Sequence, residues 1–183
     1  MDRIRFRALL ESYQTTFEEE RDFLPDFIQL TQDPVSFKRE RKSGHFTASS
    51  WIINRERTHT LLTLHRRLNR WLQLGGHADG NENLMEVAME EAREESGLQS
   101  LRLLVPAIFD IDKHLIPANA TVAQHYHYDT RFLIEADLHE PLTISSESLD
   151  LAWVPLSAVA TTVGHNPSIL RMLKKTGNST VNS

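Results

Sequence analysis

The stretch GGHADGNENLMEVAMEEAREESGL, residues 75–98, contains a glycine-rich turn followed by a segment with helical periodicity. Between residues 82 and 95 it carries six glutamates and one base, although like charges four residues apart each cost a helix roughly 0.2–0.5 kcal/mol. Glu91, Glu94 and Glu95 are spaced i, i+3, i+4, so their carboxylates share one face. Such a face is either well solvated or bound to a hard cation, because Mg²⁺ and Mn²⁺ prefer oxygen ligands and act with phosphate substrates.

The boundaries of this acidic helix are marked by its flanking residues. Asn83, with Glu86 three residues later, is a plausible capping pair. Gly97 suits the left-handed position just past the last turn. The apolar stripe consists of Met85, Ala88, Met89 and Ala92, so the helix is expected to pack on a sheet with one side and to present its acids on the other.

The composition is that of a globular protein. The chain has 183 residues, of which 40% are hydrophobic and 25% charged, which suits one domain with a core of its own. A net charge of −5 argues against general nucleic-acid binding. The absence of cysteine excludes disulfides and thiolate metal sites. Since no apolar run has the length of a membrane span and no signal peptide precedes the helices, we expect no membrane association and a cytoplasmic location.

The segments around the acidic helix predict a mixed sheet with helices packed on its faces. Helices are expected over 2–31, with Pro25 starting a second one, and over 157–162 and 167–175. Strands are expected at 45–53, 58–65, 71–74, 101–105, 108–111, 126–137 and 151–154, with loops at 66–70 and 112–122 and a loop or short strand at 141–148.

With its spacing, the central stretch resembles the Nudix box, G-x5-E-x7-R-E-U-x-E-E-x-G-U, in which U is a bulky apolar residue. The matching positions are Gly76, Glu82, Glu91, Ala92, Glu94, Glu95, Gly97 and Leu98. The segments GHFTAS at 44–49, WLQLGGHADG at 71–80 and HYHYDTRF at 125–132 are similar to a bacterial, MutT-like subgroup of the same family.

The resemblance implies an α+β fold, a Nudix-type α/β/α sandwich with a mixed sheet and an N-terminal helical extension. The expected organisation is a helical extension packed on the domain at 1–43, a Nudix domain at 44–175 and a flexible tail at 176–183. The N-terminal helices are expected either to cap the sheet or to form the interface of a homodimer.

The resemblance also implies an activity, the divalent-metal-dependent hydrolysis of a phosphoanhydride in a small-molecule nucleoside diphosphate linked to another moiety. Candidate substrates are nucleotide sugars, ADP-ribose, dinucleoside polyphosphates and noncanonical nucleoside triphosphates. This chemistry needs divalent cations that neutralise phosphate charge and activate water, and a carboxylate that positions the water or takes its proton.

The family's site residues transfer to matching positions of this sequence. By the resemblance, Glu91, Glu94 and Glu95 bind Mg²⁺ or Mn²⁺ together with the carbonyl of Gly75. Glu91, Glu94 and Glu82 are the expected catalytic carboxylates, of which Glu82 is either a secondary ligand or orients the helix.

One position departs from the family pattern. Glu90 stands where the box has an arginine that forms an ion pair and orients a catalytic carboxylate. Arg93 is nearby, but it lies roughly 90° or more around the helix from Glu91. The alternative function is therefore a Nudix-fold module that binds a nucleotide or related metabolite with weak or no catalysis.

Histidines and charges along the strand expected at 126–137 form a second constellation. His125, His127, Asp129 and Arg131 fall on one face by strand alternation. Two histidines spaced in this way can chelate a transition metal, line a polar cleft that contacts substrate, or hydrogen-bond within the sheet. We assign His125, His127 and Arg131 to substrate contact.

Further candidates for substrate contact are isolated residues, and each has a simpler interpretation. His77 is either a cleft residue or an ordinary loop residue, Arg66 and Arg70 either bind phosphate or lie on a solvated hairpin tip, and Glu147 is either a functional acid or a solvated one. The basic run at 38–42 is a solvated linker or a phosphate contact. Trp51 and Trp153 are expected in the core.

Overall fold

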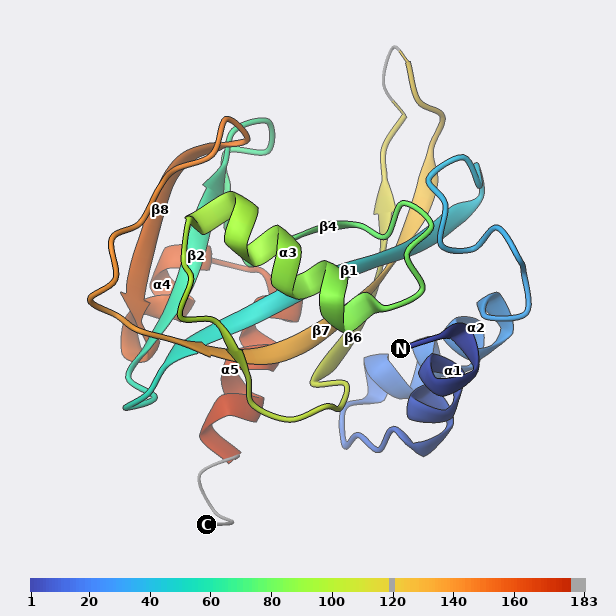
Figure 1. Cartoon of the computed structure of the whole chain (residues 1–183), viewed down its shortest axis with the longest axis horizontal. Helices are drawn as coiled ribbons and strands as arrows, with labels where there is room; N and C mark the ends of the chain where they lie inside the picture. The colour runs from blue at the N-terminus through green and yellow to red at the C-terminus, as the bar shows by residue number, and fades with distance from the viewer. Residues whose placement is uncertain (119–120, 179–183) are drawn as a thin grey trace. The chain divides into compact units, whose positions relative to one another are not determined.

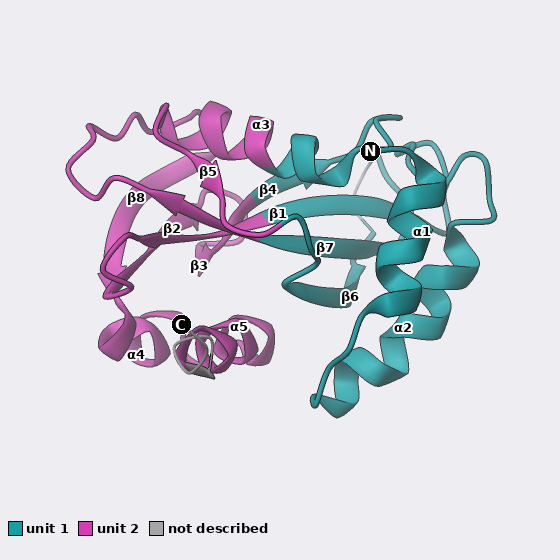
Figure 2. Cartoon of the chain, turned by 60° about the horizontal axis from the view of Figure 1, so that its bottom comes forward, with its two compact units in different colours: residues 1–49, 75–88, 106–132 teal, residues 50–74, 89–105, 133–183 magenta. Residues whose placement is uncertain are grey.

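The chain is described here by a computed structural model that covers residues 1–118 and 121–178, with the backbone alone at residue 178. Two compact units make up the chain (Figure 2). Unit 1 comprises residues 1–49, 75–88 and 106–132, and unit 2 comprises residues 50–74, 89–105 and 133–183. Each unit is therefore built from three separate parts of the sequence.

The elements follow the predicted order closely (Figure 1). The helices are α1 (Arg3–Ser12), α2 (Glu18–Leu30), α3 (Leu84–Ser96), η1 (Leu156–Ala158), α4 (Val159–Val163) and α5 (Pro167–Asn178). The strands are β1 (Gly44–Asn54), β2 (His59–His65), β3 (Arg70–Leu72), β4 (Leu74–His77), β5 (Arg102–Leu103), β6 (Asp110–Ile116), β7 (His125–Ala136) and β8 (Ser148–Pro155). The predicted α+β class is confirmed.

One sheet contains all of these strands. Its hydrogen-bonded order is β3-β2-β1-β7-β5, with β4 beside β1, β6 beside β7 and β8 beside β2. β2 and β8 pair antiparallel from His59↔Pro155 to His65↔Ser148. β6 and β7 pair antiparallel from Asp110↔Arg131 to Ile116↔His125. Because β6 pairs with β7, residues 110–116 form a strand, although the sequence predicted a loop over 112–122.

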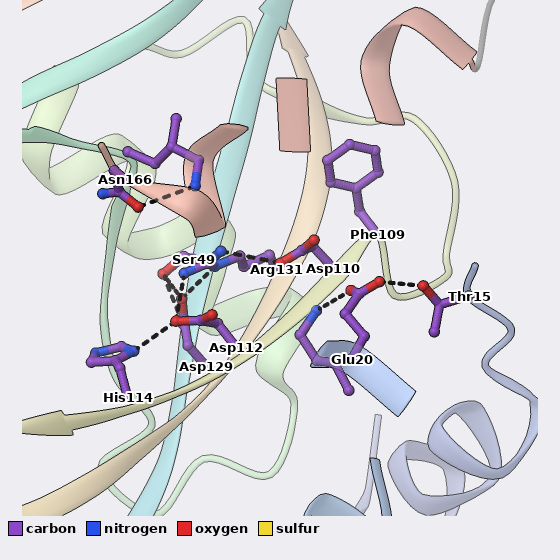
Figure 3. A network of polar contacts seen from close by, with 12 residues as sticks. Thr15, Glu20, Ser49, Phe109, Asp110, Asp112, His114, Asp129, Arg131 and Asn166 are labelled. Atoms are coloured by element: carbon purple, nitrogen blue, oxygen red, sulfur yellow. Dashed lines mark hydrogen bonds and ion pairs between the residues drawn. The ribbon is translucent and has the colours of Figure 1, made fainter. Parts of the chain in front are cut away.

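In unit 1, α1 and α2 pack through aromatic side chains. Phe6 lies edge-on to Phe46 of β1, with ring centroids 5.1 Å apart, and Phe27 of α2 lies 6.0 Å from the same ring. All three are fully buried. Buried Glu20 accepts hydrogen bonds from the Tyr13 hydroxyl at 2.7 Å and the Ile111 N–H at 3.0 Å, which ties α2 to β6. It also accepts a hydrogen bond from the Thr15 hydroxyl (Figure 3).

The prediction that Pro25 starts a second helix is wrong. α2 begins at Glu18, and Glu18, Glu19 and Glu20 give its first turn the negative charge that the helix dipole favours. Pro25 lies within the helix at an exposed position, where solvent can bond the carbonyl that the missing N–H leaves open.

Unit 2 has a buried core between strands and helices. Its members, drawn from β1, β2, α3, β7 and β8 and the segments between them, are Ile52, Leu61, Leu74, Ala92, Leu98, Leu101, Ile134, Ala136 and Leu151, with Trp153 packed against them. Trp51 is fully buried and its indole N–H donates to the Thr176 hydroxyl at 2.8 Å. Both tryptophans therefore belong to the core, as predicted.

The C-terminal helix begins at Pro167 as predicted but extends to Asn178. The predicted tail at 176–183 is thus helical over its first three residues, because buried Thr176 joins the core through Trp51. The rest of that tail lies outside the described residues. None of the described helices is long and apolar enough to cross a membrane.

Candidate functional site

The acidic helix α3 places its glutamates at different depths within unit 2. Glu95 is 9% exposed, Glu91 is half-buried, and Glu90 and Glu94 are exposed. Ala92 and Leu98 lie in the core of unit 2 and fix the orientation of this part of the helix. Glu91, Glu94 and Glu95 thus lie at half-buried, exposed and buried positions of α3, and the common face that the spacing predicts for their carboxylates stays a prediction.

The C-terminal end of α3 is anchored by Gly97. Its φ of +76° is the left-handed value predicted for this position, and its N–H donates to the carbonyl of Arg93 at 2.8 Å. A Cβ at Gly97 would lie 2.8 Å from the side chain of Thr143, whose own N–H donates to the carbonyl of Ser96 at 2.8 Å. Glycine is needed here because of the left-handed φ and because a side chain would clash with Thr143. The hydrogen bond from Thr143 to Ser96 holds the C-terminal end of α3.

The start of α3 and the loop before it belong to unit 1. Glu82 accepts hydrogen bonds from the backbone N–H of Arg3 at 3.0 Å and from its guanidinium at 2.6 Å. Asn83 and Glu86, predicted as a capping pair, contact each other through their side chains at 3.2 Å. The Arg3 contacts engage the Glu82 carboxylate with α1, which supports the interpretation that Glu82 orients the helix.

Gly75 packs directly on the backbone of β1. It has a φ of +156°, and a Cβ there would lie 2.5 Å from the Ala48 carbonyl oxygen and 2.6 Å from the Ser49 Cα. No real Cβ tolerates such distances, so only glycine allows β4 to approach β1 this closely.

Substituting Gly75→Ala is expected to destabilise the protein by about 1–3 kcal/mol, the usual cost of overpacking a rigid site. The measurement is the free energy of unfolding from urea titration followed by circular dichroism. Gly177→Ala is the matched control. Gly177 lies in α5, and a Cβ added there would meet nothing within 4 Å, so this change should be neutral or stabilising. Equal stability of Gly75→Ala and the parent protein would contradict the close packing.

A buried network of ion pairs and hydrogen bonds surrounds Arg131 (Figure 3). The guanidinium donates to Asp129 at 2.8 Å and Asp110 at 3.1 Å and lies 3.3 Å from Asp112. Asp129 also accepts hydrogen bonds from Thr47 at 3.0 Å and Ser49 at 2.8 Å. Arg131 itself is only 2% exposed.

Arg131 supplies the positive charge that the three aspartates of this network surround. Burial disfavours the charged guanidinium, but Asp112, Asp129 and Asp110 outweigh it and hold the pKa of Arg131 above its ordinary value. Because the guanidinium is fully used inside the protein, its observed role is to hold β6 and β7 together. The contact with substrate predicted for Arg131 has no support from this placement.

The histidines predicted as substrate contacts come together in unit 1. The His77 and His127 ring centroids are 5.0 Å apart, and those of His125 and His127 are 5.1 Å apart. His45, which the sequence analysis did not single out, lies 5.1–5.2 Å from all three. The sequence signal for His45 was its position directly after Gly44, at the start of the segment GHFTAS.

Two of these imidazoles are neutral at pH 7. Burial, followed by the charge of Arg39 and the neighbouring His45, lowers the pKa of His77 to about 4. Burial, followed by His77 and His114, lowers the pKa of His127 to about 2. Arg39 is itself ion-paired with Asp79, so part of the predicted basic run at 38–42 is engaged within unit 1.

The remaining candidates lie in unit 2. The Arg66 guanidinium donates to the carbonyls of Ser146 at 2.9 Å and Ser148 at 2.8 Å, and thereby fixes the segment before β8. Arg70 and Glu147 are exposed. Contact of these three residues with substrate stays a prediction.

Two kinds of metal-binding chemistry are present among the described residues. Glu91, Glu94 and Glu95 of α3 supply the carboxylate oxygens that Mg²⁺ or Mn²⁺ prefers, but their ligand atoms do not form a converging group among the described residues. The imidazoles of His45, His77 and His127 have ligand atoms within 4.8 Å of one another, a set that fits a softer transition metal.

Comparison with known proteins identifies the fold. No protein-family model and no curated protein matches the chain. Among solved structures, a C. elegans Ap4A hydrolase in a binary complex is 15% identical with a TM-score of 0.60, and the match covers 75% of this chain and 98% of that one. A Nudix-family hydrolase from Clostridium perfringens is 23% identical with a TM-score of 0.57, covering 74% and 97%. The E. coli dihydroneopterin triphosphate pyrophosphohydrolase is 14% identical with a TM-score of 0.56, covering 73% and 95%. Similarity over about three quarters of this chain and nearly the whole of each neighbour establishes that the chain has the Nudix fold, which the sequence of residues 75–98 predicted.

Proposed function

We propose that this protein is a Nudix hydrolase that cleaves a phosphoanhydride in a nucleoside diphosphate derivative with the help of Mg²⁺ or Mn²⁺. The observation that carries the proposal is the spacing of Glu91, Glu94 and Glu95 on α3, in a chain that has the Nudix fold. Two of the structural neighbours are named as an Ap4A hydrolase and a pyrophosphohydrolase, names that belong to the same kind of reaction.

The chemistry of the donor set fits this role. A bound divalent ion neutralises charge on the phosphates and lowers the pKa of a coordinated water. Glu94 and Glu95 are the ligands that the proposal relies on most, and Glu91 both binds and positions or deprotonates the attacking water. Glu82, held by Arg3, keeps the start of α3 in place. The carbonyl of Gly75 as a further ligand stays a prediction.

The proposal is tested by a screen of phosphoanhydrides with Mg²⁺ and with Mn²⁺. Nucleotide sugars, ADP-ribose, dinucleoside polyphosphates and noncanonical nucleoside triphosphates are incubated with the full chain, and release of phosphate or nucleoside monophosphate is measured. We expect turnover of at least one class, and loss of that turnover in EDTA with recovery on adding Mg²⁺. Absence of turnover across the screen would overturn the proposal.

Glu90 favours a second candidate, a module that binds a nucleotide or related metabolite without cleaving it. The arginine of the box normally forms an ion pair with a catalytic carboxylate, and a glutamate at this position cannot pair with a carboxylate. Glu90 is exposed on α3, so we expect that solvent screens its charge and that Glu90→Arg gives no more than about a threefold change in kcat/KM, which is less than 1 kcal/mol. A gain of 100-fold or more would show that the native arrangement is impaired and would favour the binding module.

A further inference from the structure

Four histidines from three strands face one another in unit 1. His45 lies at the start of β1, His77 ends β4, and His125 and His127 begin β7. β4 and β7 are both neighbours of β1 in the sheet (Figure 1). The ligand atoms of His45, His77 and His127 all lie within 4.8 Å of one another, and these three form a convergent set of three metal-ligating side chains.

His45 provides an independent sign that this space takes a ligand. The side chain is 2% exposed, and its Nε2 atom is buried with no hydrogen-bond partner. Its Nδ1 lies 3.4 Å from the carbonyl oxygen of Arg41. A carbonyl only accepts hydrogen bonds, so Nδ1 carries the proton and Nε2 carries a lone pair. Leaving such an acceptor buried and unbonded costs about 1–3 kcal/mol unless something binds it.

His125 shows the same arrangement of protons as His45. The Nδ1 of His125 donates to the carbonyl oxygen of Ala123 at 2.9 Å, which leaves its Nε2 with a lone pair. That Nε2 lies 3.3 Å from the Nε2 of His127. Two ligand nitrogens on one tetrahedral zinc ion, at Zn–N distances of about 2.0–2.1 Å, lie about 3.3–3.4 Å apart.

We propose that His45, His77 and His127 bind a divalent transition-metal ion of the zinc class through their ring nitrogens. Imidazole suits Zn²⁺, Co²⁺ and Ni²⁺, whereas Mg²⁺ prefers oxygen ligands, so this site and the Glu91–Glu95 carboxylates select different ions. Three imidazoles leave one position of a tetrahedral site for water or another ligand. The ligand atoms of the three rings already lie within 4.8 Å of one another.

Two further features suit the ion. The backbone carbonyls of Arg41 and Ala123 orient His45 and His125 through their Nδ1 atoms, as outer hydrogen bonds do in metal sites. The low pKa values of His77 and His127 keep these rings in the neutral form that binds metal. The proposal does not depend on the hydrolase activity, because it rests on the imidazoles alone.

The test uses the full chain without a histidine tag, stripped with EDTA and then dialysed. Zn²⁺ is titrated in the presence of excess Mg²⁺, which occupies carboxylate sites, and heat is measured by calorimetry. Co²⁺ is titrated in parallel, because a tetrahedral Co²⁺ site has a strong visible absorption. We expect one ion per chain, unaffected by Mg²⁺, with the tetrahedral Co²⁺ spectrum.

Variants locate the ion. His77→Gln and His127→Gln, both at half-buried positions, are each expected to weaken Zn²⁺ binding by at least about 100-fold, more than the loss of an outer hydrogen bond. His139→Gln and His165→Gln are the matched controls, since both histidines are exposed and lie in unit 2. They should bind Zn²⁺ as the parent does. Circular dichroism and the Tm establish that each variant is folded.

A measurement on the parent protein makes the test independent of variants. The chain has nine histidines, and ¹⁵N spectra of selectively labelled rings report which of them bind metal. We expect Zn²⁺ to shift the ring nitrogens of His45, His77 and His127. No stoichiometric binding, binding abolished by Mg²⁺, or binding unchanged in His77→Gln and His127→Gln would each overturn the proposal.

Discussion

Glu94→Gln is expected to lower kcat/KM of the proposed hydrolysis by at least about 100-fold, the effect typical of removing one group that stabilises transition-state charge. Glutamine keeps the size of the side chain and removes the charge that a divalent cation needs. Since Glu94 is exposed on α3, the fold should be unaffected. Glu95→Gln is expected to have an effect of similar size on turnover, with some loss of stability because Glu95 is only 9% exposed.

The measurement is steady-state kinetics across a Mg²⁺ titration, on whichever phosphoanhydride the screen identifies. A ligand variant should need more Mg²⁺ for half-maximal activity, whereas a merely destabilised variant should not. Glu86→Gln is the matched control, because Glu86 is also exposed on α3 but lies outside the i, i+3, i+4 set. Undiminished turnover in Glu94→Gln would refute its assignment as a metal ligand.

Arg131→Met is expected to destabilise the protein by about 3–5 kcal/mol, the cost of removing one partner from a buried ion pair. Methionine fills much of the same space but leaves Asp110, Asp112 and Asp129 without their cation. These carboxylates are 0%, 9% and 2% exposed, so water cannot readily replace the guanidinium. The loss is read from urea unfolding at pH 7.

Arg102→Met is the control that tests whether burial of the ion pair causes the loss of stability expected for Arg131→Met. Arg102 also pairs with a carboxylate, Glu135, at 2.9 Å, but its side chain is 63% exposed. Exposed pairs contribute about 0–1 kcal/mol, so this control should change the unfolding free energy little. Similar losses in both variants would contradict the role given to burial.

Local signals predicted α3 and its ends well. Gly97 adopts the expected left-handed conformation, and the helix ends at Ser96 as the pattern indicated. The strand β6 was missed over residues 112–116 because its residues carry no clear alternation of their own. Its existence depends on pairing with β7 from Asp110↔Arg131 onwards, a long-range contact that periodicity cannot reveal.

The candidate sites show the same limit. The sequence could place Glu91, Glu94 and Glu95 on one helix, because that depends on helical periodicity alone, whereas their common metal-binding face stays a prediction. Strand alternation could pair His125 with His127, but it could not add His77 and His45, because these reach the pair only through the neighbouring strands β4 and β1. Arg131 was expected at a substrate surface because the sequence cannot show that Asp110 and Asp112 approach it from β6.

The division of the chain into two units has a spectroscopic consequence. The chain has three tryptophans, Trp51, Trp71 and Trp153, and all belong to unit 2. Its three tyrosines, Tyr13, Tyr126 and Tyr128, all belong to unit 1. Fluorescence excited at wavelengths that only tryptophan absorbs therefore reports on unit 2, and the ring NMR resonances of the tyrosines report on unit 1. If both signals change at the same denaturant concentration, the two units unfold as one cooperative structure; if they do not, each has a stability of its own.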